Sequence, residues 1–332
     1  MEQITIPSDR DGVAYLYGHP LRNSLSPPLH QTVYNALGLN WTQIPLSSPN
    51  GPSYTQSPDI TTFLASIRAN PKFVGSSVTM PWKVAIMSHL DDLTEDARQA
   101  GACNTIFLQK DAQGNPQSYI GTNTDCIGIR EALVQNAPST AEQFRGKPAL
   151  IVGGGGTART AIYVLRRWLG VSKIYVVNRD AAEVQAIFEE DRQRNPDAAG
   201  VAPLIHVSDP AVAATLEAPV AVVSGIPNYP PKTEEEIQAR EALRVLLNRQ
   251  THETDQGVIL EMCYHPTPWT DIAQMASDAR WKVILGSEAL IWQGLEQARL
   301  WTGTDVVAVP GLVDQVKDLV AKTIAERAKS NL

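Results

Sequence analysis

Short apolar runs alternate with helical stretches along most of the chain. The runs typical of buried strands lie at residues 12–18, 73–79, 102–108, 149–152, 173–177, 220–224 and 258–262. Helical patterns follow at residues 29–37, after Pro81 and at 161–169. Proline is favoured at the start of a helix because its missing N–H is not needed in the first turn. This alternation predicts an α/β fold with largely parallel sheets.

Two further helices are predicted from their side-chain patterns. Residues 312–330 carry apolar side chains on one face, which predicts an amphipathic helix packed on a core. Residues 230–249 are charged and helical in pattern, and we interpret them as a solvated outer helix. Residues 135–148 are polar and contain two prolines, which indicates a linker.

Size and charge narrow the class of protein. The chain has 332 residues, enough for two domains, and its formal net charge of −7 argues against nucleic acid or an anionic membrane as partner. Three scattered cysteines do not make a disulfide framework, and the polar start carries no apolar signal segment. We therefore expect a cytoplasmic protein that acts on a small molecule. The dispersed histidines predict no metal site.

A glycine-rich turn follows the strand predicted at 149–152. It has the form G-x-G-x-x-A and comprises Gly153, Gly154, Gly155, Gly156, Thr157 and Ala158. Glycines permit the tight turn and let backbone N–H groups approach a pyrophosphate at the start of the next helix. A second strand ends with an acidic residue about 20 residues later, which is the spacing of a dinucleotide-binding unit. A site for NAD or NADP is therefore predicted here.

Asn178, Arg179 and Asp180, at the end of that second strand, bear on the choice of cofactor. Arg179 could pair with the 2′-phosphate of NADP, whereas Asp180 could accept from the free ribose hydroxyl of NAD and would repel the phosphate. Glu183 stands where a second cation would help to hold a phosphate. The balance favours NAD, with NADP as the alternative. Asp180 is also a natural N-cap for the helix that follows.

The polar residues of the first half do not name a reaction by themselves. Ser24 and Ser26 are typical of a turn, and Asp125 is typical of a helix cap. Lys83 is unusual because it would lie in the first turn of the helix that Pro81 opens. The positive end of the helix dipole disfavours a cation there, which would make the amine easier to deprotonate, as a general base requires.

Ordered motifs recur along nearly the whole chain. They are Gly18-His19-Pro20 with Ser24, Ser26 and His30; Val78-Thr79-Met80-Pro81-Trp82-Lys83; Gly101, Asn104 and Thr105; Gly121-Thr122-Asn123-Thr124-Asp125; the turn from Gly153 with Arg159; Asn178-Arg179; Glu261-Met262-Cys263-Tyr264-His265-Pro266; and Gly286 with Gln293 and Gly294. Together they resemble the shikimate/quinate dehydrogenase family. The amino-acid sequences of these motifs are most similar to those of the catabolic quinate dehydrogenases of filamentous fungi.

The resemblance implies a fold and a set of site residues. An N-terminal α/β substrate domain, residues 1–135, would be completed by C-terminal helices at 286–332, with a Rossmann-type dinucleotide-binding domain, residues 136–285, inserted between them. By family pattern Lys83 is the catalytic acid/base and Asp125 its carboxylate partner. Ser24 and Ser26 would hold the substrate carboxylate. The rest of the substrate site would be Ser77, Thr79, Asn104, Tyr264 and Gln293. Gly286 would join the glycine turn, Asn178, Arg179 and Asp180 at the cofactor.

Departures from the family pattern bear on the substrate. Asn23 stands where biosynthetic shikimate enzymes usually have histidine, and Ser77 stands where they usually have asparagine. The smaller Ser77 opens space on the ring-hydroxyl side, which is compatible with the saturated ring and extra C1 hydroxyl of quinate, whereas Ser26 leans towards shikimate. The resemblance thus implies an NAD-dependent quinate dehydrogenase, monomeric or homodimeric, that oxidises the C3 hydroxyl of quinate and could also accept shikimate.

Two alternatives remain at this point. One is an NADP-dependent shikimate dehydrogenase, which differs only in cofactor and substrate preference. The other is a non-catalytic regulator of the quinate pathway that resembles the family. The presence of both Lys83 and Asp125 favours an enzyme, because a sensor has no need of an acid/base pair.

Overall fold

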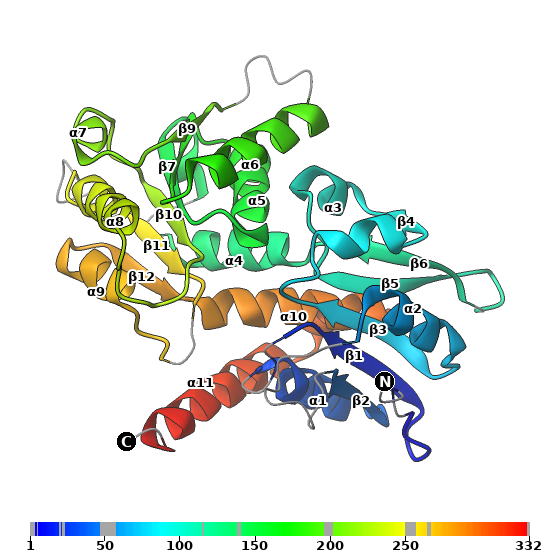
Figure 1. Cartoon of the computed structure of the whole chain (residues 1–332). Helices are drawn as coiled ribbons and strands as arrows, with labels where there is room; N and C mark the ends of the chain where they lie inside the picture. The colour runs from blue at the N-terminus through cyan, green and yellow to red at the C-terminus, as the bar shows by residue number, and fades with distance from the viewer. Residues whose placement is uncertain are drawn as a thin grey trace. The chain divides into compact units, whose positions relative to one another are not determined.

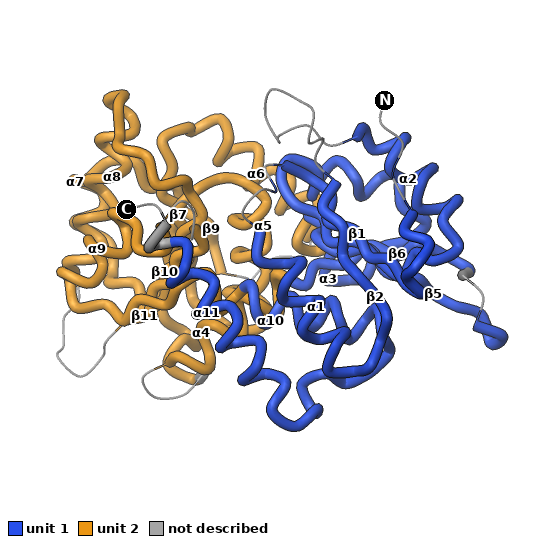
Figure 2. The backbone as a smooth tube through the Cα atoms, turned by 90° about the horizontal axis from the view of Figure 1, so that it is seen from below, with its two compact units in different colours: residues 1–98, 102–124, 290–332 blue, residues 99–101, 125–289 orange. Residues whose placement is uncertain are grey.

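The computed structural model describes residues 4, 6–19, 21, 24–46, 58–114, 116–137, 141–195, 202–249, 257–263 and 267–330. The chain folds into two units, which Figure 2 draws in different colours. Unit 1 comprises residues 1–98, 102–124 and 290–332, and unit 2 comprises residues 99–101 and 125–289. Unit 2 is thus an insertion in unit 1. The border falls at residue 125, ahead of the polar segment 135–148.

The sheet of unit 1 has the strand order β2-β1-β3-β5-β6-β4. Its strands are β1 (Gly12–Tyr17), β2 (Trp41–Pro45), β3 (Phe73–Val78), β4 (Asp92–Leu93), β5 (Thr105–Lys110) and β6 (Pro116–Thr122). β1 runs parallel to β2 and β3, but β5 is antiparallel to both β3 and β6. β5 and β6 form a hairpin, and a short connection of this kind joins only antiparallel strands. The expectation of a largely parallel sheet is confirmed for unit 1 with one exception, because β5 alone runs against the other five strands.

Helices cover both faces of this sheet. Val13, Tyr15 and Tyr17 of β1 pack with Phe63 and Ile67 of α2 (Ile60–Ala69) in one core. Ala14 points to the other face, because side chains alternate along a strand. There it packs with residues of α1 (Ser26–Ala36) and α10 (Gly286–Thr302), and α11 (Leu312–Ser330) packs on α1. The shorter helices of this part are η1 (Ala85–His89), α3 (Glu95–Ala100) and η4 (Val306–Ala308).

The sheet of unit 2 has the order β12-β11-β10-β7-β8-β9, and neighbouring strands run parallel. Its strands are β7 (Pro148–Val152), β8 (Lys173–Val177), β9 (Leu204–His206), β10 (Ala221–Ser224), β11 (Val258–Glu261) and β12 (Lys282–Leu285). In chain order this is the doubly wound arrangement of a Rossmann fold, with the order reversing between β7 and β10. The predicted Rossmann-type unit is confirmed.

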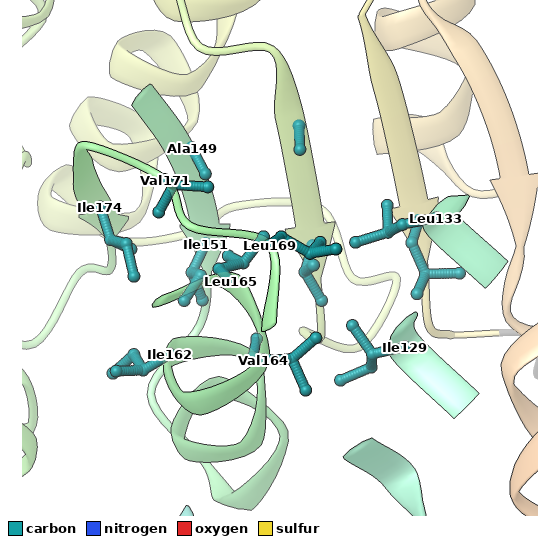
Figure 3. Packing of buried hydrophobic residues seen from close by; sticks show 14 of the residues in the cluster. Ile129, Leu133, Ala149, Ile151, Ile162, Val164, Leu165, Leu169, Val171 and Ile174 are labelled. Atoms are coloured by element: carbon teal, nitrogen blue, oxygen red, sulfur yellow. The ribbon is translucent and has the colours of Figure 1, made fainter. Parts of the chain in front are cut away.

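Alternate residues of the unit 2 strands supply two cores. Ala149 and Ile151 of β7 pack against Ile129 and Leu133 of α4 (Asp125–Asn136), together with side chains of the helix after the glycine turn, as Figure 3 shows. Leu150 and Val152 pack on the opposite face, under α8 (Glu234–Leu247) and α9 (Asp271–Asp278). The remaining helices are η2 (Ala141–Phe144), α5 (Gly156–Tyr163), η3 (Val164–Trp168), α6 (Ala181–Arg194) and α7 (Pro210–Ala213). Figure 1 labels α5, α6 and α7.

Most predicted elements are confirmed, with ends that shift by a few residues. The run at 173–177 is β8, and 312–330 is α11. The outer helix predicted within 230–249 is α8, which also buries an apolar face through Ala242, Leu243 and Leu246. The strand expected at 102–108 begins later, at Thr105.

The helix expected to begin at Pro81 is wrong. Residues 80–84 form a turn, and the 3₁₀ helix η1 begins only at Ala85. The carbonyl of Lys83 accepts the N–H of Cys103 at 2.7 Å, so it does not bond along a helix of its own. Because Lys83 does not lie in the first turn of an α-helix, the dipole argument for this lysine loses its basis.

Candidate active site

The glycine turn of unit 2 joins β7 to α5 at the carboxyl end of the parallel sheet. Gly153 has a φ of +118°, and its N–H donates to the carbonyl of Val177 at 3.0 Å, which ties the turn to β8. A Cβ at Gly154 would lie 2.4 Å from side-chain atoms of Asn178 and Glu183. A Cβ at Gly155 would meet no atom within 4 Å. The turn therefore needs glycine at 153, where φ is positive, and leaves open space at the N-terminus of α5, as a pyrophosphate site requires.

A pocket of about 450 Å³ opens beside this turn. Its walls are the glycine turn, the end of β8, residues 225–231 after β10, and the first turns of α8. It lies where the strand order reverses, which is where doubly wound sheets bind their ligands. The close approach at Gly154 and the open start of α5 fit a dinucleotide in this pocket.

Asn178 and Arg179, two of the predicted cofactor residues, line the pocket at the end of β8, and Asp180 follows them in the chain. Asp180 caps α6, since its Oδ1 accepts the N–H groups of Ala182 and Glu183 at 2.9 and 3.1 Å. Asn178 accepts the N–H of Asp180 at 3.1 Å and donates to Glu183 at 2.6 Å. The cap role expected for Asp180 is confirmed. Both capping hydrogen bonds use Oδ1, and Oδ2 takes part in neither of them.

Arg179 forms an ion pair with Glu236 of α8. The Glu236 carboxylate also accepts the backbone N–H groups of Lys232 and Thr233, and these bonds hold the pKa of Glu236 below its usual value. Arg179, the one rim residue expected to attract a 2′-phosphate, thus already faces a carboxylate.

Gly286 begins α10 against the end of β11. A Cβ there would stand 2.3 Å from the carbonyl oxygen of Met262 and 2.9 Å from that of Glu261. The buried Glu261 carboxylate accepts the N–H of Cys263 at 3.1 Å and the hydroxyl of Thr270 at 3.0 Å, and burial raises its pKa to about 7. Gly286 therefore serves close backbone packing, whatever it adds at a cofactor.

In unit 1, the predicted substrate residues Ser26, Ser77, Asn104 and Gln293 belong to one buried hydrogen-bonded array. Ser26 donates to Gln43 (2.8 Å), Gln43 to Ser77 (2.9 Å), and Ser77 to Gln297 (2.8 Å). Gln297 donates to Thr105 (2.9 Å), and Thr105 to Asn104 (2.8 Å). Asn104 donates to Thr124 (3.0 Å), and Thr124 to Gln293 (3.3 Å). Residues from β2, β3, β5, α1 and α10 are thereby held in one fixed arrangement.

Thr79 and Lys83 follow the end of β3 beside this array. The N–H of Val78 donates to the carbonyl of Asn104 at 2.6 Å, and the carbonyl of Lys83 accepts from Cys103. Lys83 is partly exposed. Ser24 lies at the start of α1, where its Oγ accepts the N–H of Ser26 at 3.2 Å.

Two predicted residues are not placed with this group. Asp125 is the first residue of α4, after Thr124, and belongs to unit 2. It is partly exposed and lies in the first turn of that helix. Tyr264, like Asn23, lies outside the described residues.

Sequence reasoning missed several residues at both sites. Gln43, Gln297, Thr105 and Thr124 connect the substrate residues, and Glu236 faces Arg179 across the pocket. Thr105 and Thr124 lie in the motifs named above, and the polar Gln43 in β2 is a further signal for the array. Nothing in the sequence pairs Glu236 with Arg179, because 57 residues separate them.

Other functional classes receive no support from the described part of the chain. It contains no cluster of three or more His, Cys, Asp or Glu that could hold a metal ion. None of its helices combines the length and apolar character that a membrane span requires. Cys103 and Cys126 are buried among apolar side chains, and burial raises the pKa of Cys263 to about 12, which disfavours a thiolate nucleophile.

Comparisons with known proteins agree with this geometry. Residues 16–106 match the family model described as the shikimate dehydrogenase substrate binding domain. The chain is 80% identical over 332 residues, 100% of both chains, to a protein of Emericella nidulans named quinate dehydrogenase.

Two solved structures are similar over nearly their whole length. One is a shikimate dehydrogenase in complex with NADP⁺, with a TM-score of 0.70 and 25% identity over 94% of this chain and 96% of that chain. The other is a quinate dehydrogenase from Corynebacterium glutamicum in complex with NAD, with a TM-score of 0.68 over 92% of this chain and 99% of that chain. At 23% identity, this second likeness supports the fold alone. Because the Emericella relative is similar over its full length and unit 2 has Rossmann topology, this chain belongs to the shikimate/quinate dehydrogenase family of oxidoreductases.

Proposed function

We propose that this chain is an NAD-dependent quinate dehydrogenase. The observation that carries the substrate is the 80% identity, over the full length of both chains, to a protein named quinate dehydrogenase. Quinate would be oxidised at its C3 hydroxyl to 3-dehydroquinate, and shikimate is a candidate second substrate. A place in the cytoplasm and a monomeric or homodimeric state stay predictions from the sequence.

The proposed substrate site lies in unit 1. We assign Ser24 and Ser26, at the start of α1, to the end of the substrate ring that bears the carboxylate. We assign Ser77, Thr79, Asn104 and Gln293 to the ring hydroxyls, and Tyr264 is added to this set by family pattern alone. Ser26 is held by Gln43, Ser77 by Gln297, and Asn104 by Gln293, so substrate binding does not have to order these side chains.

Lys83 carries the proton transfer in this proposal. A dinucleotide, when bound, supplies the hydride acceptor. The hydrogen on C3 would leave as a hydride with the electron pair of the C3–H bond. The unprotonated amine of Lys83 would take the proton of the C3 hydroxyl at the same time, and the alcohol becomes a ketone. Asp125, by family pattern, is the carboxylate that orients the reacting hydroxyl and offsets the positive charge formed on Lys83.

The proposed cofactor site is the pocket of unit 2. The turn from Gly153 to Ala158 would hold the pyrophosphate, and Asn178, Arg179 and Asp180 would face the adenosine ribose. The charges at the rim favour NAD over NADP. Glu236 pairs with Arg179, and Asp180 and Glu183 add two further carboxylates, so a 2′-phosphate would meet net negative charge.

We expect Asp180→Ala to weaken NAD binding about tenfold and to relax discrimination against NADP. The lost carboxylate both accepts from the ribose and repels a phosphate, and a charged hydrogen bond is worth roughly that factor. Binding of each cofactor would be followed by quenching of protein fluorescence, without substrate. Asp180→Asn keeps an N-cap but loses the charge, so it isolates the repulsion. Asp209→Ala removes the similar cap of α7 and should leave both affinities unchanged. An unchanged NAD/NADP ratio in both Asp180 variants would mean that the ribose is read elsewhere.

The proposed function is tested by initial rates of the purified chain with quinate or shikimate, each with NAD⁺ or NADP⁺. We expect the highest kcat/KM for quinate with NAD⁺. A maximum for shikimate with NADP⁺ would identify the alternative dehydrogenase. Binding of quinate without turnover in any combination would instead support a regulator.

A further inference from the structure

The hydrogen-bonded array of unit 1 has one direction. From Ser26 through Gln43, Ser77, Gln297, Thr105, Asn104 and Thr124 to Gln293, each side chain donates to the next. Gln293 then donates to the backbone carbonyl of Leu290 at 3.1 Å. The hydroxyls of Ser26, Ser77 and Thr105 each have one proton and donate it to the next side chain. The hydroxyl of Thr124 has two acceptors within reach, Oε1 of Gln293 at 3.3 Å and Oδ1 of Asn104 at 3.2 Å.

Two backbone carbonyls support this direction, because a carbonyl can only accept. The Nε2 of Gln43 faces the oxygen of Tyr15, and the Nε2 of Gln297 faces the oxygen of Asn104, both at 3.5 Å. A flipped Gln43 would place its own oxygen against the oxygen of Tyr15. Ser77 would then need its single proton for both Gln43 and Gln297.

His30 supports the direction at the Gln297 end. Its Nε2 lies 3.1 Å from Oε1 of Gln297, the oxygen that also accepts from Ser77. His30 is fully buried, and this burial lowers its pKa to about 4, so the ring is neutral at physiological pH. Only the tautomer that carries its proton on Nε2 can donate to Gln297.

The direction gives the two serines of the carboxylate end opposite hydrogen-bonding roles. Ser26 commits its proton to Gln43, so its oxygen has acceptor capacity only. Ser24 accepts the N–H of Ser26, and no acceptor among the described residues takes its proton. Ser24 can therefore donate to a substrate carboxylate, whereas Ser26 requires a donor from the substrate.

We propose that Gln43 is a specificity-determining positioning residue, which holds Ser26 as an acceptor for the C1 hydroxyl of quinate. Quinate carries a hydroxyl and the carboxylate on the same carbon, so it presents one donor beside one acceptor. That pair matches Ser26 beside Ser24. Shikimate has no C1 hydroxyl and would leave the Ser26 oxygen unpaired or facing a carboxylate oxygen, which is unfavourable in a buried site. The proposal rests on the proposed function and names how the same site selects its substrate.

The test replaces Gln43 by methionine, which has a similar shape but accepts no proton from Ser26. With its proton released, Ser26 can donate to a carboxylate, so quinate loses its advantage. We expect the quinate/shikimate ratio of kcat/KM to fall roughly tenfold, the worth of one ordinary hydrogen bond. Most of the change should appear as a higher KM for quinate, with kcat for shikimate retained. Dissociation constants for both acids, measured without turnover, should shift in the same ratio.

Two further variants separate this role from a loss of packing. In a Ser26→Ala background, Gln43→Met should no longer change the ratio, because the side chain through which Gln43 acts is gone. Gln297→Met removes another buried amide of the array that does not touch Ser26, and it should affect the two substrates alike. Thermal unfolding checks that each variant is folded.

Failure of the proposal for Gln43 can be distinguished from failure of the proposed function. If the unmodified chain does not oxidise quinate, the proposed function fails before any variant is compared. If it does, an unchanged ratio in folded Gln43→Met, or an equal change in the Ser26→Ala background, overturns the role of Gln43.

Discussion

Replacing Lys83 with alanine is expected to lower kcat for quinate oxidation by roughly 10²–10⁴-fold, with little change in KM. A positioned acid/base group contributes a factor of this size, because without it the alcohol proton must leave to water as the hydride departs. Lys83 stands in an exposed turn after β3, so its loss removes no core packing. Steady-state rates with saturating dinucleotide measure the effect.

The control for this variant is Lys110→Ala. Lys110 ends β5 in the same unit, is exposed, and carries the same charge away from the proposed site. It should retain normal kcat. A kcat within a few-fold of normal in Lys83→Ala would contradict the assignment of Lys83 as the acid/base and direct the search to another group.

Gly286→Ala is expected to destabilise the chain by about 3 kcal/mol. The added methyl would lie 2.3 Å from the Met262 carbonyl oxygen, and the nearby atoms belong to the backbone, which cannot rotate away as a flexible side chain can. For a unit of this size the loss corresponds to a fall in Tm on the order of 10 °C. Circular dichroism during heating would measure it.

Gly155→Ala is the matched control for stability. A Cβ at Gly155 would meet no atom within 4 Å, and its backbone is in an ordinary extended conformation, so we expect a change of about 1 kcal/mol or less. Should Gly286→Ala melt with the unmodified chain while its NAD affinity falls, Gly286 would be a cofactor contact and not a packing position.

Local sequence features determined a large part of this protein. Apolar runs predicted four strands of unit 2, β7, β8, β10 and β11, and the glycines at 153–155 predicted the turn between β7 and α5. Asp180 was recognisable as an N-cap because capping depends on the few residues that follow it. The family motifs indicated the oxidoreductase class, since each motif is a short continuous segment.

Local patterns failed where a longer-range bond overrode them. Pro81 predicted a helix, but the carbonyl of Lys83 bonds to Cys103, 20 residues further on, and a turn forms in its place. The sheet of unit 1 is largely parallel as expected, and only β5 is reversed, because it pairs with β6 as a hairpin. For Lys83 the deciding partner lies outside the window that propensity reads.

The features that bear most on specificity were decided by tertiary structure alone. Ser77 meets Gln297 across 220 residues, and Arg179 meets Glu236 across 57. The sequence identifies Ser26 as a serine of the site, but whether its hydroxyl donates or accepts depends on Gln43 from a different strand. A hydroxyl has one proton, and only the folded arrangement of its neighbours determines where that proton points.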